Sequence, residues 1–166
     1  MIDRKLGYFI AAVVFAADQL VKWLMIGPFA LQTVRQIVLL PIFNLSWTEN
    51  NGISLGLLNA ETDTGRWALV ALTGAIALGV AVWIGREKQR GDQLALGMVL
   101  GGALGNILDR IRFGYVVDFA DLHFGDFRPF LVFNVADAAI SIGVIILLLR
   151  AFLVRDERPK ENVEHA

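Results

Sequence analysis

The chain has 166 residues, of which 56% are hydrophobic, and it carries a formal net charge of −1. That apolar share is too large for the core of one small soluble domain, and it indicates a membrane protein. The balanced charge offers no basic surface for nucleic acid, and the absence of cysteine excludes disulfides, thiol nucleophiles and thiolate metal sites.

Four long apolar stretches each approach the roughly 20 residues that a helix needs to cross about 30 Å of hydrocarbon. They cover residues 6–26, 67–84, 93–111 and 133–153. Four crossings leave no room for a second domain in so short a chain. We therefore expect a single integral membrane domain, residues 1–166, that is mainly α-helical.

The first stretch is also compatible with a cleaved signal peptide, because Arg4 and Lys5 precede an apolar run. The apolar pattern resumes beyond Asp18 and Lys22, which favours a retained membrane helix. Asp18 and Lys22 are four residues apart and are therefore neighbours on a helix. We expect them to form a structural ion pair; the alternative is that Lys22 extends to the membrane surface beside Trp23.

The segment 27–66 combines a strand pattern with a turn signal. Apolar and polar residues alternate from 43 to 48, the period of a strand with one apolar face. Asn50-Asn51-Gly52 then predicts a turn. We expect a small β-containing cap resting on the membrane, with a helical or irregular part near residues 54–60.

The distribution of cations predicts the orientation of the chain. Lys and Arg gather before the first helix, in the loop 85–92 and in the tail 154–166. The positive-inside rule assigns these segments, and with them both termini, to the cytoplasm. The cap 27–66 and the link 112–132 then face the outside. Helix 93–111 runs outward and the last helix runs inward, so residues near this link share the outer face.

Two aspartates lie in apolar surroundings at that face: Asp118, within 115–119, and Asp137, within 133–139. An ionised carboxylate in such a place costs several kcal/mol unless it is paired, protonated or hydrated. Two close carboxylates share one proton, so the ionised one can activate water while the protonated one polarises a carbonyl. The pair indicates a hydrolase that needs no cofactor.

Polar and small residues surround the expected pair. Asn134 and Ser141 fall on the same stripe of the last helix as Asp137. Three polar side chains cluster at the outer end of the preceding helix: Asn106, Asp109 and Arg110. Glycine recurs there every four residues, at Gly97, Gly101 and Gly105, which lets another helix backbone approach closely. The simplest interpretation is a supporting shell, in which Asp109 and Arg110 pair at a helix interface.

The chain lacks the residues that other intramembrane protease mechanisms require. His123 and His165 are the only histidines, and neither lies in an apolar stretch, so an intramembrane serine–histidine pair is missing. The His-Glu-x-x-His helix of zinc proteases is absent, and we expect no metal site. The presenilin motif Gly-x-Gly-Asp is not matched either, because His123 to Asp126 lacks the first glycine.

Three motifs, in this order, resemble the bacterial lipoprotein signal peptidase (signal peptidase II) family. They are Gly105-Asn106-Ile107-Leu108-Asp109-Arg110, Val116-Val117-Asp118-Phe119 and Phe133-Asn134-Val135-Ala136-Asp137. The resemblance covers most of the chain, including Asp18, Lys22 and the Asn50-x-Gly52 turn. After that turn the family usually has small and aromatic residues, where this chain has Ile53-Ser54-Leu55.

The resemblance implies an aspartyl endopeptidase with Asp118 and Asp137 as its catalytic pair. Four further residues, by the same resemblance, shape the site or hold substrate: Asn106, Asp109, Arg110 and Asn134. Asn50 would lie in the cap near them. The implied reaction removes the signal peptide of a prolipoprotein before a cysteine that carries diacylglycerol. The implied setting is the bacterial cytoplasmic (inner) membrane, with lipidated prolipoproteins and membrane lipid as partners of a monomeric chain.

Two other function classes remain as alternatives. A small proton- or ion-coupled transporter would also keep buried carboxylates along its pathway. The two halves of the chain show no inverted repeat, and Asp118 stands in a link and not at the membrane midplane, which favours the protease. A scaffold without chemistry would leave both acids unexplained.

Overall fold

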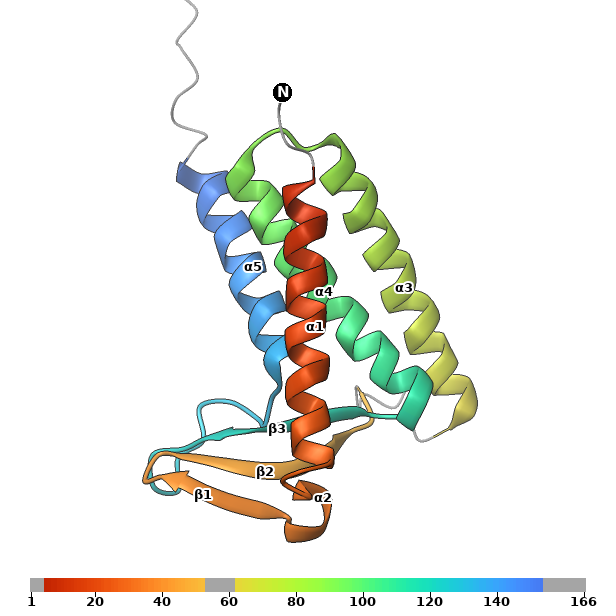
Figure 1. Ribbon diagram of the computed structural model, residues 1–166. Coiled ribbons are helices and arrows are strands. Elements are labelled where there is room, and N and C mark those ends of the chain that lie inside the picture. Colours follow the sequence, from red (N-terminus) through yellow and green to blue (C-terminus); the bar gives the residue numbers. More distant parts are fainter. Residues whose placement is uncertain (1–4, 53–61, 154–166) are drawn as a thin grey trace, which may run out of the picture.

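Four long helices form a bundle, and a small antiparallel sheet lies across one end of it (Figure 1). This computed structural model describes residues 5–52 and 62–153. The expectations for residues 54–60, for Ile53-Ser54-Leu55 and for the tail 154–166 therefore lie outside the described residues.

The predicted mainly helical fold with four membrane helices is confirmed. The long helices are α1 (Leu6–Ile26), α3 (Asp63–Arg86), α4 (Arg90–Phe113) and α5 (Val135–Leu153), and each is long and apolar enough to cross a membrane. Helices α3 and α4 begin earlier than predicted, because their first turns are polar and escape a search for apolar runs. Thr62 caps α3 by accepting a hydrogen bond from the amide of Gly65 at 3.1 Å.

Helix α4 is the centre of the bundle and packs against α1, α3 and α5. Half of its apolar span is buried, against about a fifth for each of the other three helices. Gly97 and Gly101 lie against the backbone of α1, where a Cβ on Gly101 would stand 2.5 Å from the carbonyl oxygen of Ala11. Gly102 meets the carbonyl of Ala136 in α5 in the same way. The glycine stripe therefore permits the close helix approach that its spacing predicts.

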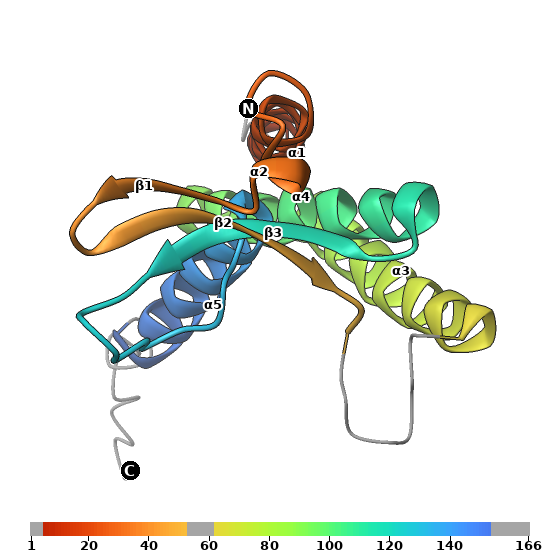
Figure 2. The same ribbon diagram turned by 90° about the horizontal axis from the view of Figure 1, so that it is seen from below.

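The sheet has the strand order β1-β2-β3, with both pairs antiparallel, and runs across the ends of the helices (Figure 2). A short helix α2 (Leu31–Val34) and strand β1 (Gln36–Leu40) form the stretch before the predicted strand. Strand β2 (Phe43–Asn50) confirms the predicted strand and extends it by two residues.

The sequence predicts only a link between helices at strand β3 (Val116–Leu122). Nearly all of its residues are buried, on both faces of the sheet, so the sequence shows no alternation there. Its pairing sets Thr48 opposite Asp118 and Asn50 opposite Val116. This register brings the turn after β2 to the side of Asp118.

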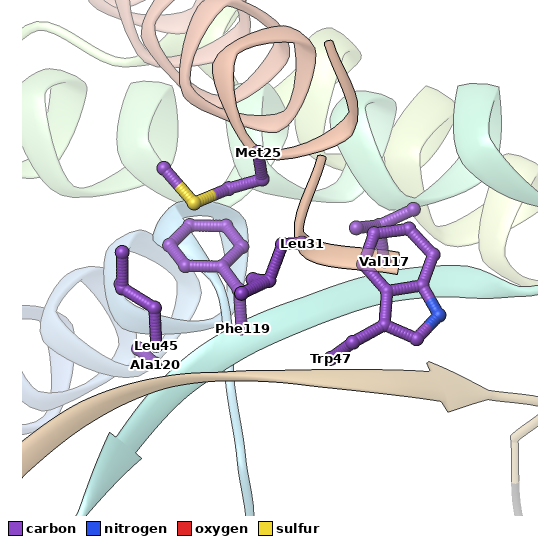
Figure 3. Packing of buried hydrophobic residues seen from close by; sticks show 7 residues of the cluster. All are labelled: Met25, Leu31, Leu45, Trp47, Val117, Phe119 and Ala120. Carbon is purple, nitrogen blue, oxygen red and sulfur yellow. The ribbon is translucent and has the colours of Figure 1, made fainter. Parts of the chain in front are cut away.

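A hydrophobic cluster fixes the sheet to the bundle (Figure 3). Its buried members come from the end of α1, from α2 and from two strands: Met25, Leu31, Leu45, Trp47, Val117, Phe119 and Ala120. Leu45 and Trp47 belong to the apolar face that the alternation in β2 predicts. Burial of each large side chain of this kind contributes about 1.5–3 kcal/mol, so the sheet is held against the helix ends by packing.

Candidate active site

Asp118 and Asp137 meet where the sheet joins the bundle. Asp118 lies in β3 and is 1% exposed, whereas Asp137 lies in the first turn of α5 and is half-buried. Burial, together with repulsion from the Asp137 carboxylate, raises the pKa of Asp118 to about 7, although the hydrogen bonds from Asn50 and Asn134 oppose the increase. The two acids thus come from elements that are separate in sequence but adjacent in the fold.

Asn134 connects the two aspartates. It caps α5: its Oδ1 accepts a hydrogen bond from the Asp137 amide at 2.8 Å, and Asp137 Oδ2 accepts one from the Asn134 amide at 3.2 Å. This reciprocal pair is a capping box, with Asp137 at its third helical position. The side-chain Nδ2 of Asn134 donates to Asp118 Oδ1 at 2.6 Å. One asparagine therefore sets the geometry of both carboxylates.

Asn50 binds the second oxygen of Asp118. Its Nδ2 donates to Asp118 Oδ2 at 2.9 Å, while its Oδ1 accepts the amide of Gly52, also at 2.9 Å. The turn predicted at Asn50-Asn51-Gly52 thus orients the Asn50 amide group. Gly52 has φ +97°, a backbone conformation that favours glycine.

Asn106 of α4 binds the other oxygen of Asp137. Its Nδ2 donates to Asp137 Oδ1 at 2.8 Å. Its Oδ1 accepts from Lys22 Nζ and from Asn134 Nδ2, each at 3.2 Å. All four oxygens of the two aspartates therefore receive one N–H donor each from Asn50, Asn106 or Asn134.

A buried charge cluster lies behind this amide layer. Lys22 Nζ is 2.8 Å from Asp18 Oδ2 and 2.7 Å from Asp109 Oδ2, and Lys22 is only 2% exposed. Gln19 donates to Asp109 at 3.0 Å and to Asp18 at 3.2 Å. Gln19 is the one member of this cluster that sequence reasoning missed; its only signal is a polar residue beside Asp18 in an apolar helix.

The expected pairing of Asp109 with Arg110 is wrong. Neighbouring residues on a helix point to different sides, and Asp109 instead binds Lys22 and accepts the amide of Val117 at 3.2 Å. Arg110 is half-buried, and among residues 5–52 and 62–153 its Nε has no hydrogen-bond partner. Its charge acts on Asp137, Asp118 and Asp109. Arg110 therefore brings a free donor and a positive charge to the edge of the site.

An apolar cavity of about 350 Å³ adjoins Asp137. It is bounded by the segment before α5 and by one face of that helix: Phe130, Phe133, Asp137, Ala138, Ser141 and Ile142. Ser141 thus shares the stripe of Asp137, as the helical spacing predicts. An apolar group seated in this cavity would lie directly beside the carboxylate.

Asp121 is bound elsewhere on the sheet. Arg128 Nε lies 3.1 Å from its Oδ1, and Ser46 Oγ donates to its Oδ2 at 3.2 Å. Burial raises the pKa of Asp121, but these hydrogen bonds outweigh burial and hold the pKa below its ordinary value. The pKa of Asp121 is therefore lowered, whereas that of Asp118 is raised.

This arrangement suits proton exchange with a water molecule. One buried carboxyl group has a pKa near neutrality, and a second, half-exposed carboxylate lies at the positive end of a helix. Across the described part of the chain, no three His or acidic side chains are grouped so as to hold a metal ion.

Comparisons with known proteins agree on one family. The signal peptidase (SPase) II family matches residues 10–153. The chain is 56% identical to the lipoprotein signal peptidase of Sphingopyxis alaskensis, over 92% of this chain and 88% of that protein. It is also 56% identical to the lipoprotein signal peptidase of Rhizorhabdus wittichii, over 98% and 95% of the two chains.

Two solved structures, each described as a bacterial membrane enzyme, have a similar fold. One, at 2.3 Å resolution, is 27% identical with a TM-score of 0.72 and covers 96% of this chain and 94% of its own. The other, at 1.9 Å, is 28% identical with a TM-score of 0.73 and covers 89% and 92%.

Proposed function

This chain belongs to the signal peptidase II family, the peptidases that remove signal peptides from prolipoproteins, and we propose that Asp118 and Asp137 are its catalytic pair. The observation that carries this assignment is the bridge through Asn134, which donates to Asp118 and forms the capping box with Asp137. Proton exchange needs two carboxyl groups held in one fixed geometry, and the bridge through Asn134 supports such a geometry.

Asp137 acts as the base. Two N–H donors, from Asn106 and from the amide of Asn134, stabilise its ionised form, as does the N-terminus of α5. Its partial exposure gives water access to it. Asp118 acts as the acid, because its raised pKa of about 7 keeps a proton on it near neutral pH.

The peptide bond is then hydrolysed in two steps. Asp137 takes a proton from water, the hydroxide oxygen bonds to the carbonyl carbon, and Asp118 gives its proton to the carbonyl oxygen. In the second step the carbon–nitrogen bond breaks, the leaving amine takes the proton from Asp137, and Asp118 regains a proton from the collapsing hydroxyl group. Both carboxyl groups return to their starting states, and no covalent intermediate forms.

The substrate proposal is a diacylglyceryl-modified prolipoprotein cut before its lipidated cysteine. The apolar cavity beside Asp137 supports a substrate that carries apolar groups next to the reacting bond. The Nε of Arg110 has no hydrogen-bond partner in the described part of the chain, which supports a contact with a substrate carbonyl or ester oxygen.

Four apolar helices and the family assignment fit a multi-pass protein of the bacterial inner membrane. We further propose that the sheet and both aspartates face the outside. We also propose that the chain is one integral membrane domain and acts as a monomer. The bundle supports this orientation, since the start of α1, the basic loop between α3 and α4, and the end of α5 share the end away from the sheet (Figure 1).

The test is processing of a lipidated prolipoprotein by the purified protein in detergent, followed as a gel shift and by mass analysis of the product. We expect one cut on the amino side of the modified cysteine, and no cut when the cysteine carries no lipid. Cleavage at another bond would refute the substrate proposal, and an intact precursor would refute the activity.

A further inference from the structure

We propose that Lys22 is a positioning residue for the reaction: its ammonium group orients the Asn106 amide, so that Asn106 donates a hydrogen bond to Asp137. Sequence reasoning assigns Lys22 only to a structural ion pair with Asp18. The inference rests on the proposed function, because it takes Asp137 as the base.

The chemistry of the two side chains determines the direction of the amide. An ammonium group has three donors and no acceptor, so Asn106 must turn its oxygen toward Lys22. The amide nitrogen then points to Asp137, where it donates at 2.8 Å. With the amide reversed, the oxygen of Asn106 would face a carboxylate oxygen, and two acceptors would repel each other.

Within residues 5–52 and 62–153, no other group near Asn106 replaces Lys22 in orienting its amide. The second contact to its oxygen comes from Asn134 Nδ2 at 3.2 Å. That nitrogen makes its short contact, 2.6 Å, with Asp118 and lies 3.3 Å from the carbonyl of Val117. Its remaining hydrogen is therefore shared between two acceptors. Lys22 lies at the same distance from the Asn106 oxygen, 3.2 Å, but after its contacts with Asp18 and Asp109 it still has a third hydrogen for that oxygen alone.

The partners of Lys22 also hold the backbone beside each aspartate. Asp18 Oδ1 accepts the amide of Ala136, the residue before Asp137, at 3.0 Å. Asp109 Oδ2 accepts the amide of Val117, the residue before Asp118, at 3.2 Å. Lys22 pairs with both of these carboxylates at once, so its ammonium group lies between the two side chains that hold the backbone beside each aspartate.

Stability alone is a poor explanation of this cluster. Buried ion pairs often stabilise a fold no better than apolar side chains of similar size, because the charges lose their hydration. Removal of one partner, in contrast, leaves unpaired buried charge and destabilises strongly. A test must therefore separate the charge balance from the contact with Asn106.

The triple variant Lys22→Met/Asp18→Asn/Asp109→Asn makes that separation. It removes all three charges, while each asparagine oxygen can still accept the amide of Ala136 or Val117. We expect a melting temperature close to that of the parent in detergent, with kcat lowered about 10- to 100-fold and KM within about threefold. A kcat within twofold of the parent would show that Lys22 is only structural.

A double-mutant cycle between Lys22 and Asn106 covers the case in which the triple variant unfolds. Rates are expressed per folded enzyme for Lys22→Met, Asn106→Ala and their combination. If Lys22 acts through Asn106, Lys22→Met lowers kcat far less in the Asn106→Ala background than in the parent. An equal factor in both backgrounds would overturn the proposal.

Arg150→Met is the control, since it breaks the partly exposed ion pair of Arg150 with Asp92 at the opposite end of the bundle. It should lower the melting temperature and leave kcat per folded enzyme unchanged. Asp118→Asn is run in parallel: full activity of that variant would refute the catalytic pair itself. An inactive Asp118→Asn enzyme beside a fully active triple variant would refute only the role of Lys22.

Discussion

Three asparagines face the two aspartates, and a fixed donor orients each of them. The amide of Gly52 holds the oxygen of Asn50, the amide of Asp137 holds that of Asn134, and Lys22 holds that of Asn106. Every nitrogen is thereby turned to a carboxylate. The acids are surrounded by donors whose directions are determined before substrate binds, which is the preorganisation that proton transfer and charge development require.

Asp118→Asn and Asp137→Asn should each lower kcat by at least about a thousandfold, because each removes one half of the proton exchange and nearly preserves shape. The double variant should be hardly slower than either single variant, since the pair acts as a unit. The measurement is single-turnover cleavage of a lipidated precursor.

The neighbouring acids provide the control for this prediction. Asp126 is exposed, and Asp121 is held by Arg128 and Ser46, which an asparagine could still contact. Asp121→Asn and Asp126→Asn should keep substantial activity. If Asp118→Asn kept near-parental activity and Asp121→Asn was inactive, the partner of Asp137 would be Asp121, and the proposed mechanism would be wrong.

The pH dependence follows from the proton on Asp118. With a pKa of about 7, this carboxyl loses its proton as pH rises, so kcat/KM should fall about tenfold per unit above neutral pH. The hydrogen bond from Asn50 favours the ionised form and therefore lowers the pKa. Asn50→Ala should raise the pKa and move the descending limb to higher pH; a limb that moves to lower pH would contradict the assignment.

At the scale of elements, the packing of α1 on α4 depends on glycine. A methyl group on Gly101 would stand 2.5 Å from the Ala11 oxygen and 2.8 Å from Val14 Cβ, so Gly101→Ala must push the helices apart. We expect a loss of about 1–3 kcal/mol, seen as a lower melting temperature in detergent.

Gly79 of α3 supplies the comparison, because a Cβ there meets nothing within 4 Å. Gly79→Ala should leave stability unchanged or raise it by up to about 1 kcal/mol, since alanine is the better helix former. Equal melting temperatures for both variants would mean that the close approach of α1 and α4 is not needed for stability.

The sequence predicts a helix or strand correctly where one pattern, apolar length or alternation, is enough to identify it. Apolar length finds the four helices, and alternation finds β2 with its buried Leu45 and Trp47. Strand β3 escapes because burial on both faces erases alternation, and β1 because most of its residues are exposed. The contact of Lys22 with Asp109 escapes as well, since helical spacing reports only neighbours on the same helix.

At the scale of the whole molecule, the absence of cysteine makes the orientation easy to measure. Single cysteines at the exposed positions Asp126 and Lys88 can be probed on spheroplasts with an impermeant thiol reagent. We expect labelling at position 126 without lysis and at position 88 only after lysis. The opposite result would reverse the orientation and move both aspartates to the cytoplasmic side.

The hydrogen-bond network that joins Lys22 in α1 to Asn134 and Asp137 connects the first and the last long helix to be synthesised. The first long helix to leave the ribosome carries the ammonium group, and the last carries one of the two acids. On the proposed assignment, a partly inserted chain has Asp118 but lacks both its partner Asp137 and Asn134, the residue that links the two. On that assignment, proteolytic activity begins only after α5 has been made and packed, so a partly inserted chain does not cut the membrane proteins that assemble beside it.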